Sequence, residues 1–271
     1  MKSKVKQYYT EYGEGEWKRL IKDPYHQMEF NTSMHFLKKY LPKKGLILDA
    51  GAGPGRYTVA LAKQGYDVVL RDLTPKFVEM ARKKVKYAGV SKRVKSLEIG
   101  DITNLSEFKD GTFDAVICLG GPLTHVVDKK QRERAAAELV RVAKKGSLVF
   151  VSLMTRFSIH IDALEDFQEE IVPLQRKIRD TGDYPGGKSG FAPSHFFMPE
   201  ELDDLFKRKG LEVITLVGLE GLSTDRKKKV NKLYRTNKKA WDIWWETHLK
   251  TCTHPGAVGI SSHMMIIGRK K

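Results

Sequence analysis

Three glycines and three aspartates carry the strongest chemical signal in this chain of 271 residues. Gly51, Gly53 and Gly55 belong to the segment DAGAGPG, which begins at Asp49 after the apolar run of residues 46–48. Glycine accepts a positive φ and lets a ligand approach the backbone closely. The amides that open a following helix favour a ligand with oxygens or negative charge. The pattern therefore predicts a nucleotide-like ligand, the alternative being a tight strand-to-helix connection that binds nothing.

Two further aspartates favour the ligand. Asp72 closes the apolar run of residues 68–70, about 20 residues after the glycines, at the spacing where an acid can bind ribose hydroxyls. Asp101 follows the alternating run of residues 94–99 in the segment GDI. Ligands of open α/β sheets bind at the carboxyl ends of strands. We therefore expect these acids to lie at one edge of a sheet.

Alternating strands and helices must position these residues. Strands are predicted near residues 46–48, 68–70, 94–99 and 113–119, and helical apolar spacing appears at 77–85 and 137–143. Because strands alternate with helices through Met154, the pattern predicts a mostly parallel sheet.

The chain resembles the class I S-adenosylmethionine-dependent methyltransferases over about residues 44–154, and more loosely to its C-terminus. The motifs that carry the resemblance are DAGAGPG (49–55), RDLTP (71–75), GDI (100–102), FDAVICLGGPLTHV (113–126) and ELVRVAKKGSLVFVSLM (138–154). A nicotinamide-dependent dehydrogenase is the rival explanation of the glycine turn. Its usual pattern is GxGxxG, whereas the glycines here fall as GAGPG, and Asp49 and GDI fit the methyltransferases better.

The resemblance implies S-adenosyl-L-methionine as the cofactor. It implies that the turn from Asp49 to Gly55 surrounds the methionine part, that Asp72 takes the ribose hydroxyls and that Asp101 reaches the exocyclic adenine amine. The full set of cofactor contacts that we expect is Asp49, Gly51, Gly53, Gly55, Asp72, Leu73, Asp101, Ile102, Leu119, Tyr9 and Arg19.

The resemblance also implies the fold and its divisions. We expect an α/β, Rossmann-like, seven-stranded, mostly parallel sheet with an antiparallel last strand, helices on both faces and helical cap insertions. One methyltransferase domain would span residues 1–271, made of an N-terminal helical lid (1–41), a cofactor-binding half (42–154), a cap insertion (155–198) and a C-terminal part (199–271) with a second helical insertion at about 220–259.

Three regions outside the shared core are expected to determine the acceptor. Residues 8–41 are rich in aromatics and form either a lid, with Tyr8, Tyr9 and Arg19 as its contacts, or helices that only pack on the sheet. The apolar stripe of residues 164–178 predicts an amphipathic helix of about five turns that Pro173 should kink or break. A loop rich in glycine and proline follows.

The aromatic stripe of residues 230–249 indicates either a helix packed on the other insertion or a wall for an apolar or cationic acceptor.

Methyl transfer needs a base only when the acceptor must lose a proton. The predicted catalytic residues are His125, which the resemblance places beside the transferring methyl, and His195, at the end of the long loop. His160 is a further candidate, Tyr8 and Tyr9 are weaker ones, and each histidine has a purely structural role as its alternative.

The net charge of +16 does not decide the substrate. Scattered basic runs indicate either a solvated lysine-rich surface or a nucleic-acid footprint. We predict a small-molecule acceptor, with an RNA or protein methyltransferase as the alternative and a non-catalytic cofactor-binding protein as the second. No zinc-ligand cluster, secretory segment or membrane-spanning run is visible, and Cys118 and Cys252 form no disulfide framework, so we expect a cytoplasmic protein without a metal. The oligomeric state is left open.

Overall fold

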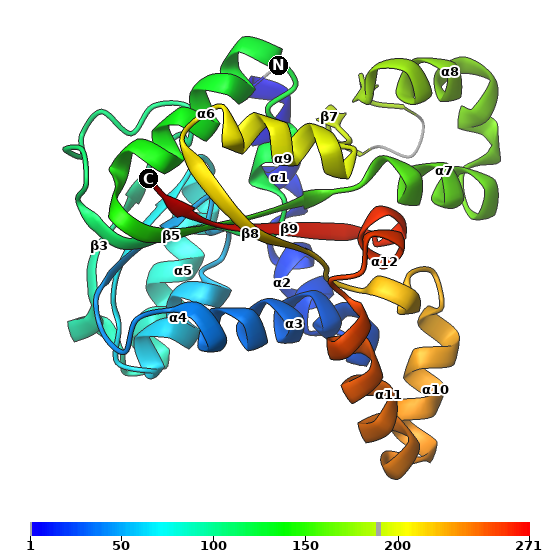
Figure 1. Ribbon diagram of the computed structural model, residues 1–271, viewed down its shortest axis with the longest axis horizontal. Coiled ribbons are helices and arrows are strands. Elements are labelled where there is room, and N and C mark those ends of the chain that lie inside the picture. Colours follow the sequence, from blue (N-terminus) through cyan, green and yellow to red (C-terminus); the bar gives the residue numbers. More distant parts are fainter. Residues whose placement is uncertain (1, 188–190) are drawn as a thin grey trace.

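A seven-stranded sheet forms the centre of the computed structural model, which describes residues 2–187 and 191–271 (Figure 1). The strands lie in the order β3-β2-β1-β4-β5-β9-β8. They are β1 (Leu46–Ala50), β2 (Asp67–Asp72), β3 (Val94–Ile99), β4 (Phe113–Cys118), β5 (Ala143–Met154), β8 (Leu211–Gly218) and β9 (His263–Lys270). β9 is antiparallel to both of its neighbours, and the other strands run parallel. The predicted sheet, with its antiparallel last strand, is confirmed.

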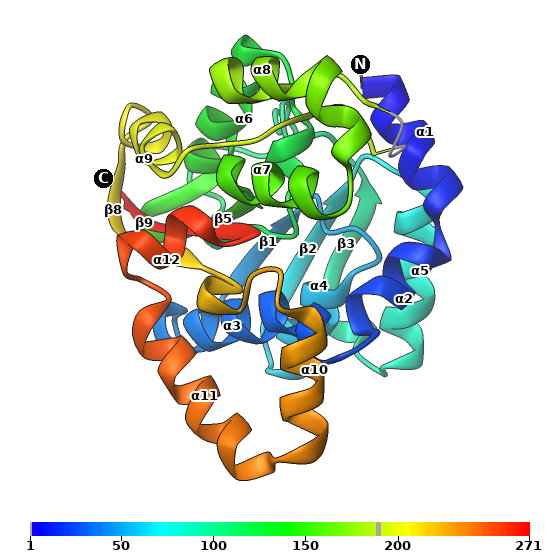
Figure 2. The same cartoon turned by 90° about the vertical axis from the view of Figure 1, so that its right-hand side faces the viewer.

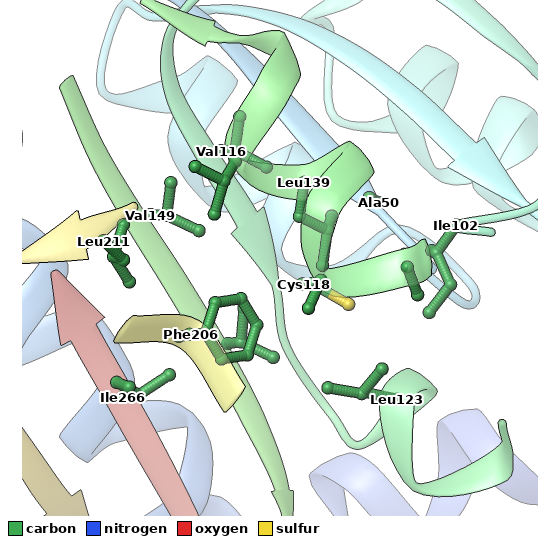
Figure 3. Packing of buried hydrophobic residues seen from close by; sticks show 14 of the residues in the cluster. Ala50, Ile102, Val116, Cys118, Leu123, Leu139, Val149, Phe206, Leu211 and Ile266 are labelled. Atoms are coloured by element: carbon green, nitrogen blue, oxygen red, sulfur yellow. The ribbon is translucent and has the colours of Figure 1, made fainter. Parts of the chain in front are cut away.

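Helices cover both faces of this sheet. On one face lie α6 (Lys129–Val142) and α9 (Pro199–Lys207), and on the other lie α3 (Pro24–Tyr40), α4 (Arg56–Lys63) and α5 (Pro75–Tyr87). Figure 3 shows the first of these interfaces, where Leu139 and Phe206 pack with Val116, Cys118 and Val149. Strands buried on both sides read as continuous apolar runs, which is why these strands could be located from the sequence.

Two short helices precede α3 and run past α5 at one end of the molecule (Figure 2). They are α1 (Lys2–Tyr12) and α2 (Glu14–Ile21). Lys76 Nζ of α5 donates a hydrogen bond to the Thr10 carbonyl at 3.0 Å, and Lys84 Nζ lies 3.6 Å from the centre of the Trp17 ring. These contacts attach the N-terminal helices to the sheet that they partly cover.

The first insertion contains α7 (Arg156–Glu165), the 3₁₀ turn η3 (Gln168–Glu170), α8 (Ile171–Thr181) and the strand pair β6 (Asp183–Tyr184) and β7 (Ser194–His195). The predicted single helix is therefore two helices. The break falls at residues 166–170, and Pro173 lies in the first turn of α8, where a missing N–H leaves no helical hydrogen bond unmade. Residues 188–190 of the long loop lie outside the described residues.

The second insertion contains η4 (Gly221–Ser223), α10 (Lys227–Thr236), α11 (Lys238–Thr251) and α12 (Pro255–Ile260). α10 and α11 form a hairpin that projects away from α7 and α8 (Figure 2). Its apolar stripe packs on α3, where Val230 and Trp241 surround the fully buried Met28. The sequence suggested that this stripe packs on the first insertion. The contact with α7 of that insertion is made by α12.

The remaining 3₁₀ turns are η1 (Ser91–Arg93) and η2 (Pro122–His125). Among the described residues, no helix combines the length and the apolar character needed to cross a membrane.

Candidate functional site

The glycine turn between β1 and α4 requires glycine at three positions for two different reasons. Gly51, Gly53 and Gly55 all have positive φ, at 75°, 54° and 82°. A Cβ on Gly51 would lie 2.4 Å from a side-chain carbon of Pro122, and one on Gly55 would lie 2.9 Å from the Ala81 Cβ. A Cβ on Gly53 would meet no protein atom within 4 Å. Gly51 and Gly55 thus allow the turn to pack, while Gly53 leaves space for a ligand.

Asp72 holds this turn in place. Its carboxylate accepts hydrogen bonds from the backbone N–H of Gly53 at 2.7 Å and of Thr74 at 2.8 Å. Burial raises the pKa of Asp72 to about 6, and the backbone hydrogen bonds oppose that rise. Asp72 is therefore a ligand-facing acid and also the link between the glycine turn and the end of β2.

Asp49 lies behind the turn and is fully buried. Thr58 Oγ1 donates a 2.6 Å hydrogen bond to its Oδ2, whereas Oδ1 has no hydrogen-bond partner among the described residues. Burial raises the pKa of Asp49 to about 7. Because a buried acceptor without a donor is costly, this orphaned oxygen indicates a ligand or a water molecule beside it.

A cavity of about 260 Å³ opens at the carboxyl ends of β1 to β4. We call it the edge cavity. The predicted cofactor contacts that line it are Gly51, Gly53, Asp72, Leu73, Asp101, Ile102, Leu119 and Tyr9. Asp49 and Gly55 support the turn from behind. Arg19 does not line the cavity, since its guanidinium binds Glu16 at 2.7 Å and Glu16 is the residue that faces inward.

The N-terminal helices form the opposite wall of the edge cavity. Val5 and Tyr9 come from α1, Glu16 and Leu20 from α2, and Glu29 from α3. Of the three regions expected to determine the acceptor, this one alone supplies residues that line the cavity in the described part of the chain.

Tyr9 and His125 join this wall to the loop after β4. The Tyr9 hydroxyl lies 2.7 Å from His125 Nε2, and His125 Nδ1 lies 3.3 Å from the Pro193 carbonyl. Because a carbonyl only accepts hydrogen bonds, the proton belongs on Nδ1, so Nε2 accepts from the Tyr9 hydroxyl. Burial lowers the pKa of His125 to about 4, and the imidazole is therefore neutral near pH 7.

His195 lies away from the edge cavity. Its Nδ1 is 2.6 Å from an Asp183 carboxylate oxygen, and its Nε2 is 2.7 Å from a Glu201 carboxylate oxygen. Both ring nitrogens are thereby engaged, and the ring ties the β6–β7 pair to α9. His160 likewise lies outside the cavity, where its Nδ1 meets the Gln175 amide at 2.6 Å.

A buried acidic cluster at the ends of β8 and β9 was missed by the sequence reasoning. Glu220 accepts hydrogen bonds from His263 Nδ1 and from the His263 backbone N–H, both at 2.8 Å. One carboxylate oxygen each of Glu29 and Glu220 and one ring nitrogen of His263 lie within 4.8 Å of one another. Burial alone would lower the pKa of His263, but Glu29 and Glu220 outweigh it and raise that pKa to about 9.

The edge cavity is acidic although the whole chain carries a net charge of +16. The carboxylates among its described lining residues are Glu16, Glu29, Asp72, Asp101 and Asp128. Arg56 is the one guanidinium among them, and it stacks on the Phe30 ring at 3.9 Å. The cavity therefore suits ligands that carry positive charge or hydroxyl groups.

The fold and the glycine turn are similar to those of the class I S-adenosylmethionine-dependent methyltransferases. Residues 47–146 match the family described as "Methyltransferase domain". A glycine/sarcosine N-methyltransferase of Parasynechococcus marenigrum is 29% identical over 50% of this chain and 46% of its own length. A ubiquinone biosynthesis O-methyltransferase of Bordetella avium is 30% identical over 64% of this chain and 65% of its own. The chain thus spans about half to two thirds of these curated relatives.

Solved structures show the same fold. An S-adenosylmethionine-dependent methyltransferase from Methanosarcina mazei aligns with a TM-score of 0.61 at 20% identity, covering 87% of this chain and 96% of that one. Another, from Thermotoga maritima, aligns with a TM-score of 0.59 at 22% identity, covering 98% of this chain and 99% of that one.

The residues of the edge cavity fit the methyl donor of this family. Gly53 leaves open space where a side chain would stand, and the orphaned Asp49 oxygen lies behind the same turn. Asp72 and Asp101 supply carboxylates at the ends of neighbouring strands, where an acid can accept hydrogen bonds from ribose hydroxyls.

Proposed function

We propose that this protein transfers a methyl group from S-adenosyl-L-methionine to a small-molecule acceptor. The observation that carries the proposal is the edge cavity, which lies between the glycine turn and the N-terminal helices and is lined by carboxylates. Such a wall repels the phosphates of a nucleic acid, so the geometry favours a small acceptor over RNA despite the basic surface.

The donor supplies an electrophilic methyl on its sulfonium. The protein aligns the two reactants and keeps water away from them. Asp72 and Asp101 orient the ribose and adenine, while the glycine turn leaves space for the methionine part. Leu20 and Val5 cover the cavity from the N-terminal helices and exclude water. Alignment of two reactants in a dry site supplies much of the rate gain in such a displacement.

We assign the proton-handling role to His125 and Tyr9. Nε2 of the neutral imidazole accepts the hydrogen bond of the Tyr9 hydroxyl, and Tyr9 lines the cavity in which the acceptor would bind. An acceptor that must lose its proton can pass it to Tyr9 as the Tyr9 proton moves to Nε2. An acceptor without such a proton needs only the positioning. We do not extend a catalytic role to His195, because both of its ring nitrogens are engaged outside the cavity.

The relatives support the acceptor class but leave its reacting atom open. Their names cover N-methylation of glycine and sarcosine and O-methylation in ubiquinone biosynthesis. Both acceptor classes are small molecules.

A transfer assay with methyl-labelled donor tests the proposal. The protein is incubated with a metabolite extract, with and without nuclease and protease, and labelled products are separated by mass. We expect labelled products of low mass that survive both treatments and disappear in Asp72→Asn. Product lost after nuclease or protease would contradict the small-molecule assignment, and donor binding without any labelled product would support the non-catalytic alternative.

A further inference from the structure

Glu29 presents an unusual carboxylate to the edge cavity. It lies on α3, is 6% exposed, and lines the cavity. Its Oε1 is buried and has no hydrogen-bond partner among the described residues. A buried carboxylate without a donor carries a large desolvation cost, so its position indicates that a ligand supplies the missing donor.

The described neighbours of Glu29 leave its Oε1 without a hydrogen bond. Glu220 forms an ion pair with His263 at 2.8 Å and also accepts hydrogen bonds from the Ser261 hydroxyl and the His263 backbone. That pair is balanced by itself, because one carboxylate meets one imidazolium. Glu29 adds a second carboxylate within 4.8 Å. The guanidiniums of Arg19 and Arg56 attract it electrostatically, but its Oε1 receives no hydrogen bond from the described residues.

The strand order places Glu29 away from the nucleoside end of the cavity. Asp72 and Asp101 follow β2 and β3, near one side of the sheet. Glu220 follows β8 and His263 begins β9. In the strand order, β8 and β9 lie on the opposite side of β1 and β4 from β2 and β3. Glu29 lies against the second pair, so a cation bound there would lie on the side away from adenine and ribose.

We infer that the methyl acceptor carries a protonated amine, and that Glu29 binds its ammonium group. The inference rests on the proposed function and names the acceptor class of the same site. An ammonium offers up to three N–H donors, so it can supply the hydrogen bond that the buried Oε1 of Glu29 lacks and place a positive charge beside the carboxylate.

A divalent metal fits this cluster less well. The His263 Nδ1 proton is committed to Glu220, and the raised pKa of His263 keeps the ring protonated near pH 7. A metal at Nε2 would have to displace the second ring proton, since only neutral imidazole is a ligand.

Calorimetry on the full chain saturated with S-adenosylhomocysteine tests the inference. The probes are phenethylamine and propylamine, each compared with the alcohol of the same carbon skeleton. The variants are Glu29→Gln and, as a matched control, Glu79→Gln on the exposed face of α5, where Glu79 pairs only with Lys83. We expect wild type and Glu79→Gln to bind an amine and not its alcohol, and Glu29→Gln to bind the amine at least about tenfold more weakly.

Several results would overturn the inference. Equal binding of amine and alcohol by wild type would do so, as would an unchanged amine affinity in Glu29→Gln. A tenfold loss of S-adenosylhomocysteine affinity in that variant would instead assign Glu29 to the donor site. Stoichiometric binding of Mn²⁺ or Zn²⁺ that Glu29→Gln abolishes would also overturn it. The wild-type comparison of amine with alcohol stands even if the variant fails to fold.

Labelled methyl transfer to the metabolite extract separates this inference from the proposed function, because an ammonium held by Glu29 has no free electron pair and the methyl must go to another atom of the acceptor. Glu29-dependent amine binding with no labelled product from any acceptor would contradict the function and leave the amine site. Labelled product from neutral acceptors only would retain the function and contradict the amine site.

Discussion

At the scale of single residues, the glycine turn separates packing from binding. Gly51 faces the Pro122 ring, so its missing side chain serves contact between two protein loops. Gly53 faces open space in the edge cavity, so its missing side chain serves a ligand. The sequence motif alone does not distinguish these two uses.

The pair Gly51→Ala and Gly53→Ala measures this difference. Gly51→Ala forces a carbon to 2.4 Å from Pro122, and we expect it to lower the free energy of unfolding by about 1–3 kcal/mol. Gly53→Ala should cost less in folding and more in S-adenosylhomocysteine affinity. Urea titration and calorimetry on both variants check this; a reversed order of the two unfolding effects would refute it.

Asp72→Asn tests the double role of Asp72. The amide of asparagine keeps the shape of the carboxylate but loses its charge. The carboxylate oxygens accept hydrogen bonds from the Gly53 and Thr74 N–H groups and would accept them from ribose hydroxyls. We expect S-adenosylhomocysteine affinity to fall by at least about tenfold, since hydrogen bonds to charged groups contribute about 1.5–3 kcal/mol each. Asp67→Asn, at the opposite end of β2 where Asp67 pairs with Arg93, is the control and should bind normally. Equal affinity in both variants would remove Asp72 from the donor site.

Tyr9→Phe tests the proton-handling pair. The change removes the hydroxyl that binds His125 Nε2 and keeps the ring against Phe77. We expect a loss of about 10²–10⁴ in the rate of methyl transfer to an acceptor that must lose a proton, with S-adenosylhomocysteine affinity nearly unchanged. A transfer rate in Tyr9→Phe equal to that of wild type would leave Tyr9 and His125 a packing role only.

The residues at the carboxyl ends of β1 to β4 could be located because they follow strands in a short, ordered stretch of sequence, and their contacts with the cofactor stay a prediction. The acid cluster could not, since Glu29, Glu220 and His263 lie far apart in the chain and none belongs to a motif. The antiparallel β9 alone brings the last of them to the ligand edge. His195 lies at the end of the long loop, where the sequence suggested a catalytic residue. Its two carboxylate partners, Asp183 and Glu201, could not be predicted from the sequence.

At the scale of elements, the N-terminal helices differ from the two insertions. α1 to α3 contribute side chains to the edge cavity, whereas α10 and α11 pack on α3 and contribute none among the described residues. The apolar stripes of the two kinds of helix look alike in sequence. Only the packing shows which stripe reaches the ligand.

Hydrogen exchange with and without S-adenosylhomocysteine checks this division. We expect ligand to slow exchange in α1 and α2 by closing the wall that they form, and to leave α10 and α11 unchanged. Protection of the hairpin equal to that of α1 would show that the second insertion takes part in binding.

At the scale of the whole molecule, one half-buried histidine, His263, links stability to pH. The pKa of His263 is about 9 in the folded protein against an ordinary 6.5. Protonated His263 therefore favours folding fully below about pH 6.5, and its contribution is lost as the pH rises through 9. The loss is at most about 3.5 kcal/mol, because one pKa unit corresponds to about 1.4 kcal/mol.

Urea unfolding of wild type and His263→Gln at several pH values tests this linkage. We expect the difference in unfolding free energy between the two proteins to shrink from pH 6.5 to pH 9.5. A difference that stays constant or grows over that range would show that Glu29 and Glu220 do not hold the proton.

The two cysteines give the molecule a built-in pair of reporters. Both are fully buried, Cys118 in β4 beneath the ligand edge and Cys252 just after α11. Burial raises the pKa of each thiol, that of Cys252 to about 11, so neither reacts with a thiol reagent until its surroundings open. With the other cysteine replaced by serine or alanine, the labelling rate of Cys118 would report opening of the central sheet. The labelling rate of Cys252 would report detachment of the α10–α11 hairpin, so one reagent could time the two events separately.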